Sequence, residues 1–127
     1  MNGFKKGLLG RYSEELVVKY LLERGYKIVL RNYRCPVGEI DIISQKGEYI
    51  CFVEVRSRSE SDYGRPYETV TFSKQKKISK TAKYFIAQYP QFYNNYSFRF
   101  DVASVILKDI DNYSIEYIEG AFEVLGI

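Results

Sequence analysis

The chain has 127 residues, of which 46% are hydrophobic and 17% aromatic, so it can bury one core but is too short for separate cofactor and substrate lobes. It has no histidine and only two cysteines, which excludes histidine-based catalytic triads, histidine-containing zinc sites and four-cysteine metal clusters. No segment reads as a signal peptide or a membrane span. We expect one domain over residues 1–127, cytoplasmic, with reduced cysteines and no membrane contact.

The net charge is only +3, but its distribution is uneven. Residues 1–100 hold 18 Lys and Arg against 10 Asp and Glu, whereas residues 101–127 hold one lysine against six acids. This asymmetry favours a basic working face and an acidic, outward-facing hairpin at the end of the chain. Ordinary scatter of surface charge is the alternative.

The first predicted element is a helix from about Gly10 to Arg24. Residues 14, 17, 18 and 21 recur at the spacing of one helix face, and Gly25 is typical of a residue that ends a helix. A strand is expected over Lys27–Tyr33, followed by a turn at residues 35–38.

Two further segments, residues 38–44 and 48–58, predict the strands of a hairpin that turns near Gly47. The order of elements is then α-β-β-β-α-β-β, which indicates an α/β fold with a mixed sheet flanked by helices. The remaining predicted segments are a polar loop over residues 57–70, a helix from Ser73 to about Tyr89, a strand at Ser97–Leu107 and a final strand at Tyr113–Ile118.

Two acids interrupt the apolar strands of the hairpin. Asp41 lies within GEIDII and Glu54 within CFVEV, although strand interiors disfavour both residue types. If the turn centres near Gly47 and Glu48, the two carboxylates lie opposite one another. Like charges in such a cross-strand pair destabilise a sheet, so a shared proton, a cationic side chain or a metal ion is expected to compensate.

Arg56 shares the strand face of Glu54, and a plain internal ion pair is therefore the structural alternative. Glu14 adds a third acid, because its helical phase matches the apolar residues Val17 and Leu21. An inward-facing glutamate is costly unless it is partnered, so we expect Glu14 to converge on Asp41 and Glu54. Carboxylate oxygens with open positions suit Mg²⁺ or Mn²⁺.

The ordered set of Glu14, Asp41 and Glu54-Val55-Arg56 resembles the PD-(D/E)xK nuclease pattern of the restriction-endonuclease-like fold. More closely, the chain resembles the YraN-like family, which is similar to archaeal Holliday-junction resolvases. The resemblance runs from Gly10 to about Leu107 and rests on the Glu14 helix, Gly25-Tyr26, residues 31–34 (RNYR), 38–43 (GEIDII), 52–58 (FVEVRSR) and 63–66 (YGRP), Lys74, and residues 99–102 (RFDV).

The resemblance implies a metal-dependent phosphodiesterase site. Asp41 and Glu54 would be metal ligands, and Glu14 an auxiliary ligand or a residue that positions water. The lysine of active nucleases is Arg56 here, and its guanidinium stays protonated, so Arg56 can stabilise charge on a phosphate but not accept a proton from water. A serine, Ser13, stands where the family's helix often has glycine before the matching glutamate.

The second predicted helix is strongly basic. It carries five lysines and no acid, and Arg58 and Arg65 precede it in the predicted loop. Because this loop follows directly from Arg56, the basic surface should border the acidic pocket and contact phosphates. A solvated helix face is the alternative. The five lysines are Lys74, Lys76, Lys77, Lys80 and Lys83.

The aromatic segment 89–96 could stack on unpaired bases, but rings in a loop after an amphipathic helix more often cap the core. The function expected overall is that of a nuclease acting on structured or branched DNA, with Mg²⁺ or Mn²⁺ as cofactor and a homodimer as a further expectation. A non-catalytic DNA- or RNA-binding module that keeps the nuclease fold is the main alternative. A third is an interaction domain whose buried acids merely satisfy Arg56 and Arg99.

Overall fold

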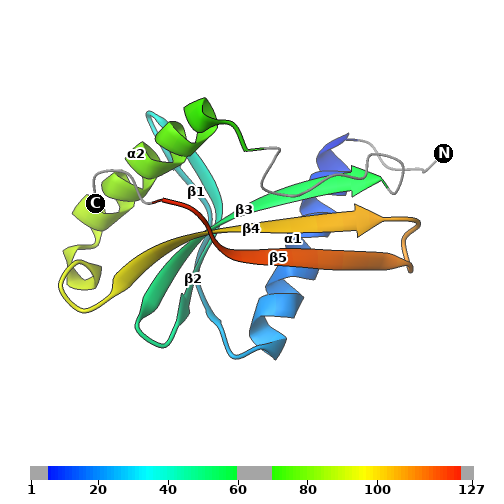
Figure 1. Cartoon of the computed structure of the whole chain (residues 1–127), viewed down its shortest axis with the longest axis horizontal. Coiled ribbons are helices and arrows are strands. Elements are labelled where there is room, and N and C mark those ends of the chain that lie inside the picture. The colour runs from blue at the N-terminus through cyan, green and yellow to red at the C-terminus, as the bar shows by residue number, and fades with distance from the viewer. Residues whose placement is uncertain (1–5, 60–69, 124–127) are drawn as a thin grey trace.

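The computed structural model describes residues 6–59 and 70–123, and Figure 1 shows their arrangement. The predicted order of elements, α-β-β-β-α-β-β, is confirmed, with one short 3-10 helix added after the second α-helix. The elements are α1 (Lys6–Glu23), β1 (Lys27–Cys35), β2 (Gly38–Lys46), β3 (Tyr49–Ser59), α2 (Phe72–Gln88), η3 (Pro90–Phe92), β4 (Ser97–Leu107) and β5 (Tyr113–Phe122).

Strands β1 and β2 each continue two residues beyond the prediction, and residues 57–59, predicted as loop, belong to β3. Two boundaries differ more. Helix α1 begins at Lys6 rather than near Gly10. The prediction began too late because Gly7 and Gly10 have a low helix propensity, which weakens the helical pattern in this segment. Strand β5 continues to Phe122 rather than ending at Ile118. Its extension passes through an irregularity in the pairing with β4, where Gly120 adopts a left-handed φ of 59° that a glycine tolerates.

The five strands form one mixed sheet in the order β1-β2-β3-β4-β5. Strands β3 and β4 are parallel, and the other neighbours are antiparallel. A parallel pair needs a crossover connection, and α2 supplies it between β3 and β4. The crossover therefore places α2 against the sheet beside β2 and β3, where the predicted site lies.

The two helices cover opposite faces of the sheet, and each face has its own core (Figure 1). On the α1 face, the predicted inward residues Val17 and Leu21 are fully buried with Val53 and Val105. On the α2 face, Phe85 packs edge-on against Phe52 with ring centroids 6.0 Å apart. The predicted inward residues of α2, namely Ile78, Ala82, Phe85 and Ile86, are all buried.

Close contact between α2 and the start of β2 depends on Gly38. A Cβ at this position would lie 2.8 Å from the Thr81 hydroxyl oxygen, and Thr81 is fully buried. A larger residue would push α2 away from β2. In the part of the chain that the structure describes, neither helix is long and apolar enough to span a membrane.

A buried charged network joins β4 to β5. Asp101 is fully buried and accepts hydrogen bonds from Arg99 Nε and Nη2 at 2.9 Å each. The Tyr117 hydroxyl donates to the same carboxylate at 2.5 Å and the Gly120 amide at 2.9 Å. Arg99 also donates to the Tyr26 hydroxyl at 2.8 Å. The carboxylate thus holds together the irregular part of the β4–β5 ladder.

Asp101→Asn should therefore lower the free energy of unfolding by about 3–5 kcal/mol, because it leaves the mostly buried Arg99 guanidinium without its buried counter-charge. Urea unfolding followed by circular dichroism measures the loss. The control is Glu119→Gln, which removes the exposed partner of Arg99 and should cost less than about 1 kcal/mol. Equal effects of the two substitutions would contradict a structural role for the buried network.

Candidate functional site

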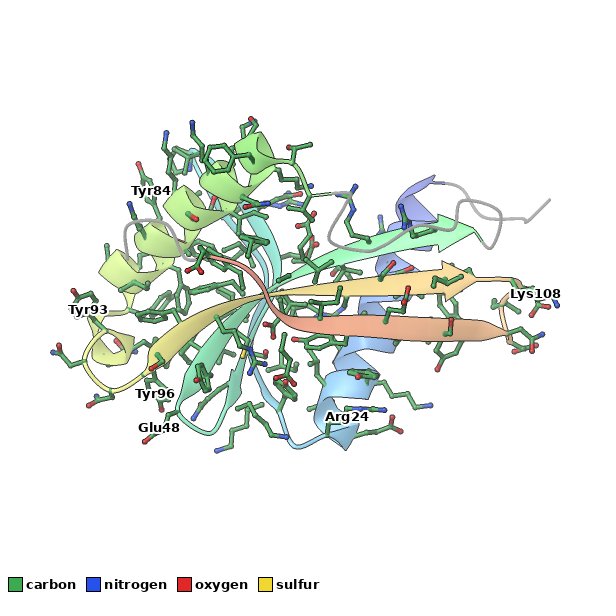
Figure 2. The ribbon with its side chains drawn as sticks, in the orientation of Figure 1. Arg24, Glu48, Tyr84, Tyr93, Tyr96 and Lys108 are labelled. Atoms are coloured by element: carbon green, nitrogen blue, oxygen red, sulfur yellow. The ribbon has the colours of Figure 1, made fainter. Side chains whose placement is uncertain are left out.

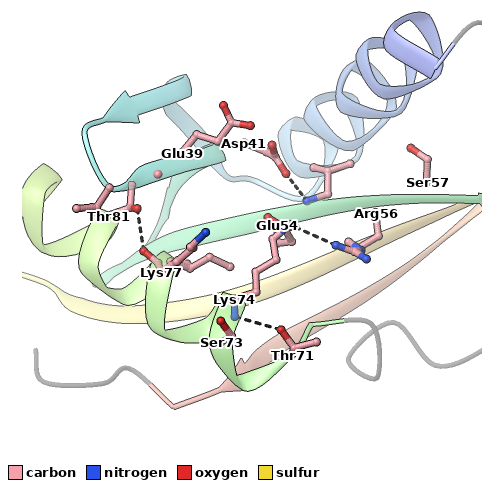
Figure 3. Close-up of a pocket in the computed structure, with 14 residues that line it drawn as sticks. Glu39, Asp41, Glu54, Arg56, Ser57, Thr71, Ser73, Lys74, Lys77 and Thr81 are labelled. Atoms are coloured by element: carbon pink, nitrogen blue, oxygen red, sulfur yellow. Dashed lines mark hydrogen bonds and ion pairs between the residues drawn. The ribbon is translucent and has the colours of Figure 1, made fainter.

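A hollow of about 610 Å³ lies between the first turns of α2 and the ends of β2 and β3 that face it. Figure 3 shows the acids on the strand side and the lysines on the helix side. Its polar lining combines carboxylates, cations and hydroxyls from three elements. The named groups are Glu39, Asp41, Glu54, Arg56, Ser57, Thr71, Ser73, Lys74, Lys77 and Thr81.

Asp41 lies where β2 separates from β3. The hairpin pairs Ile42 with Val53, and this register puts Asp41 and Glu54 one step further along, opposite one another as the sequence predicts. The backbone ladder stops at this step, and Asp41 Oδ2 accepts a hydrogen bond from the Val55 amide at 2.8 Å. One carboxylate oxygen thus replaces a ladder carbonyl and keeps the side chain at the edge of the hollow.

The surroundings of Asp41 favour its protonated form. Burial and the nearby Glu54 raise the pKa of the Asp41 carboxyl from 3.8 to about 7, and Glu14 and Glu39 add to the rise. The hydrogen bond from the Val55 amide opposes this rise only partly. Among residues 6–59 and 70–123, no basic side chain forms an ion pair with Asp41.

Glu54 is buried, with 8% of its surface exposed, but two cations meet it. Lys74 Nζ lies 2.7 Å from Glu54 Oε2, and Arg56 Nη1 lies 3.3 Å from the same oxygen. The alternative of an internal ion pair with Arg56 is therefore real for Glu54. Figure 3 shows that Arg56 reaches Glu54 along β3, whereas Lys74 reaches it from α2.

The position of Glu14 differs from the predicted convergence of three acids in one site. It faces inward as its helical phase predicts, but it lines a neighbouring hollow of about 510 Å³ on the other side of Asp41, not the one that contains Glu54. Its partners come from β1: Asn32 donates a side-chain hydrogen bond, and Arg31 Nη2 lies 3.9 Å from Glu14 Oε1. Burial raises the pKa of Glu14 despite these contacts.

The two hollows share Glu39 and Asp41, so Asp41 stands between them. Within the described residues, no three Asp, Glu or Cys side chains are close enough together to form a metal-binding group. Glu39 is the third carboxylate in the hollow that contains Asp41 and Glu54. It forms an ion pair with Arg34 at 3.2 Å.

Buried acids satisfy both Arg56 and Arg99, as the third interpretation expects: Glu54 pairs with Arg56, and the fully buried Asp101 pairs with Arg99. Arg99 is bound to Asp101 and to Glu119 in the β4–β5 network and takes no part in the hollow. The sequence places both arginines near acids in adjoining strands but does not tell on which face of the sheet each acid lies.

The lysines of α2 fall into two groups. Lys74 and Lys77 line the hollow, whereas Lys76, Lys80 and Lys83 are exposed on the outer surface of the helix. Arg58 is half-buried on β3, and Arg65 lies outside the described residues. The predicted contact between the basic surface and the acidic pocket is therefore made by Lys74 and Lys77, in the first turns of α2.

The sequence reasoning missed the contact of Lys74 with Glu54. The signal that could have found it is Thr71, whose hydroxyl caps α2 by accepting a hydrogen bond from the Lys74 amide at 3.2 Å. This cap fixes Lys74 in the first helical turn, next to the end of the polar loop. Ser57 was also missed; its hydroxyl donates to the Ser13 hydroxyl at 2.6 Å and ties β3 to α1 beside the hollow.

The aromatic segment after α2 mostly caps the core, as the structural alternative predicts. Phe92 stacks on Phe85 at 5.6 Å and contacts Tyr96 at 5.5 Å. Tyr93 is the most exposed ring of this segment, with 58% of its surface accessible, and Tyr89 is 36% exposed although its ring packs against Phe85.

Comparison with known proteins shows which family the chain belongs to. The model of the Uncharacterised protein family UPF0102 matches residues 13–105, which include the Glu14 helix, the acidic hairpin and α2. The chain belongs to the UPF0102 family. This is the YraN-like family that the sequence resembles, and that part of the resemblance is confirmed.

Members of the UPF0102 family in clostridia are similar over nearly their whole length. A UPF0102 protein of Clostridium acetobutylicum is 47% identical over 116 residues, which cover 91% of this chain and 93% of the relative. One of Clostridium novyi is 46% identical over 123 residues, covering 96% of this chain and all of the relative. One of Clostridium botulinum is 44% identical over 117 residues, covering 91% and 94%.

The raised pKa of Asp41 predicts a pH-dependent effect of Asp41→Asn in metal-free buffer. Because the folded pKa of about 7 lies above the ordinary 3.8, the native state holds this proton more tightly than the unfolded state. The contribution of Asp41 to stability is full below about pH 4 and is lost as the pH rises through about 7. The variant should therefore gain on the wild type by up to about 1.4 kcal/mol per pH unit across that window.

Urea unfolding at several pH values in EDTA measures this difference. Glu48→Gln is the control, since Glu48 is exposed in the turn of the same hairpin and faces no buried acid. A difference between Asp41→Asn and the wild type that stays constant with pH would rule out a raised pKa for this carboxyl.

Proposed function

We propose that this UPF0102 protein is a divalent-metal-dependent phosphodiesterase that cleaves structured or branched DNA. The observation that supports this most directly is the pairing of two opposed carboxylates, Asp41 and Glu54, in one hollow with the cations Lys74 and Lys77. The carboxylates on one side of the hollow suit a positively charged metal ion, and the lysines on the other side suit the negatively charged phosphates of a nucleic acid.

The chemistry of the donor set fits Mg²⁺ or Mn²⁺. Asp41 and Glu54 offer hard carboxylate oxygens, and the hollow is large enough to leave room for water and a phosphate. Within the described residues no cation forms an ion pair with Asp41, so a divalent cation could take the place of the proton that its surroundings favour. When bound, such an ion lowers the pKa of an attacking water and offsets charge on the phosphate.

Asp41 and Glu54 would hold the metal. Glu14 is too far to one side to share their hollow, but its charge acts on Asp41. We assign it an auxiliary role, in which it orients groups from the neighbouring hollow. The Val55 amide keeps Asp41 in place, so this carboxylate does not need to reorganise when its charge is used.

The PD-(D/E)xK pattern has a lysine where this chain has Arg56, and Lys74 of α2 brings an ammonium group to the same place. The Arg56 guanidinium is a planar group suited to bind two phosphate oxygens, whereas the compact Lys74 ammonium suits a single water oxygen. Lys74 Nζ approaches the same Glu54 oxygen as Arg56 does, from a different element. We therefore assign phosphate binding to Arg56 and Lys77, and orientation of the attacking water to Lys74.

One observation favours a second candidate, a non-catalytic DNA- or RNA-binding module. Glu54 already has two cationic partners, so part of the charge that a metal would balance is met by Arg56 and Lys74. Such a module would keep the lysine surface of α2 and bind nucleic acid through phosphates without cutting it. Its binding would be sensitive to salt and independent of the acids.

The cleavage proposal predicts that Mn²⁺ or Mg²⁺ supports nicking of a branched DNA, and that Asp41→Asn and Glu54→Gln each lower the rate at least about 100-fold. The reason is that the metal's charge stabilisation is worth several kcal/mol. Gel assays with labelled junctions and a metal titration measure the rate. Glu116→Gln, an exposed change on β5, should behave as the wild type does.

Binding without nicking at every metal concentration, with affinity unchanged by Asp41→Asn and Glu54→Gln, would support the binding module instead. If no nucleic acid of any structure binds at low salt, both candidates fail and only an interaction domain is left.

Lys74→Met should lower the nicking rate by about 10²-fold or more, as expected for loss of a group that positions or transfers a proton. Lys19→Met is the matched control, because Lys19 is an exposed lysine on α1, away from the acidic pair. Single-turnover rates at several pH values measure the effect. If Lys74 acts only as a phosphate contact, the substitution raises KM and leaves kcat unchanged, which would contradict the assigned role.

A further inference from the structure

One row of side chains on α2 runs from the lining of the hollow to the exposed surface of the helix. Ser73 and Lys77 both line the hollow, and Tyr84 follows them at the spacing of one helical row (i, i+4, i+11). Lys80 is exposed and lies beside this row on its outer side. Lys76 and Lys83 lie on the opposite flank of the helix, where Lys76 Nζ stands 5.3 Å from the centre of the exposed Phe72 ring.

Tyr84 is not part of the aromatic core. It is 46% exposed, whereas its neighbour Phe85 is 1% exposed and packs against Tyr33, Phe52 and Phe92. Figure 2 shows Tyr84 on the outer side of α2. A large, half-exposed ring outside the two core clusters, in line with lysines that lead out of a charged hollow, has the composition of a single-strand binding surface.

The dimensions suit a strand that leaves the hollow. Lys77 and Tyr84 are separated by about 10 Å along the helix axis. A backbone that passes Lys77 and Lys80 through its phosphates can therefore place a base over the Tyr84 ring. The bases of an intact duplex are already stacked on one another, so only an unpaired base can lie on this ring.

We propose that Lys77, Lys80 and Tyr84 form a track for an unpaired nucleic-acid strand, in which the lysines contact phosphates and Tyr84 stacks on a base. The proposal rests on the function assigned to the Asp41–Glu54 hollow, and it narrows the substrate. The substrate is a nucleic acid whose strand is unpaired next to the phosphate held in the hollow, such as the single-stranded arm of a branched DNA.

The test is direct binding in EDTA, where cleavage does not interfere. Fluorescence anisotropy is measured for the full chain with a labelled single strand and with a blunt duplex of the same length. Tyr84→Leu should weaken binding of the single strand about 5- to 100-fold and leave the duplex nearly unchanged, while Tyr84→Phe should keep the wild-type affinity. Tyr113→Leu is the matched control, because Tyr113 is 39% exposed on β5.

Two further readouts make the result specific. A 2-aminopurine in the single strand should be quenched by the wild type and by Tyr84→Phe but not by Tyr84→Leu, as stacking requires. Lys80→Gln should reduce the salt dependence of single-strand binding by about one phosphate contact. Thermal unfolding of each variant shows whether it is folded, and since Tyr84 and Lys80 are exposed, little change is expected.

Equal losses for single strand and duplex in Tyr84→Leu, or equal effects of Tyr84→Leu and Tyr113→Leu, would overturn the track. So would an affinity for the single strand that none of these substitutions changes. The track and the cleavage proposal fail separately. Metal-dependent nicking without a Tyr84 effect overturns the track alone, whereas Tyr84-dependent binding without nicking overturns cleavage and leaves a single-strand binding protein.

Discussion

The hydrogen bond from the Val55 amide to the Asp41 carboxylate is the interaction on which the site depends. It occurs where β2 leaves β3, so a side chain takes the place of the next ladder partner. The exchange keeps the amide satisfied but fixes a carboxylate opposite Glu54 in a partly buried position. Asp41 therefore cannot turn to solvent without leaving a backbone donor unpaired. In this position burial and the nearby Glu54 raise its pKa, although the hydrogen bond itself opposes the rise.

The second acid of the pair is stabilised from two elements, and this requires α2 to stand close to β3. Three features bring the helix there: the parallel crossover between β3 and β4, the Thr71 cap at its first turn, and Gly38, which lets Thr81 approach β2. The position of Lys74 is thus a consequence of topology. The same helix presents its remaining lysines to solvent on the side that leads away from the hollow.

Local sequence patterns predicted the fold and the acidic side of the site, but not the contact that α2 makes with it. Hairpin symmetry about the turn at Gly47 placed Asp41 opposite Glu54, because a register is a local property. The helical phase of Glu14 correctly gave its direction but not its partners, since phase fixes a face and not the neighbours that Arg31 and Asn32 provide. The contact between Lys74 and Glu54 joins residues on either side of a long loop, so no periodicity in the sequence reports it.

Among the described strands, Asp101 is a fully buried aspartate and Asp41 a half-buried one, and their surroundings differ. Asp101 is fully buried and receives two bonds from Arg99 and one each from Tyr117 and Gly120, so its charge is balanced and its oxygens are occupied. Asp41 receives one backbone bond and faces other acids. A fully paired carboxylate has little left to offer a ligand, whereas an acid held against its own preference does. That contrast, more than the presence of acids in strands, supports the proposal that Asp41 and Glu54, at the open end of the β2–β3 hairpin, form the functional site.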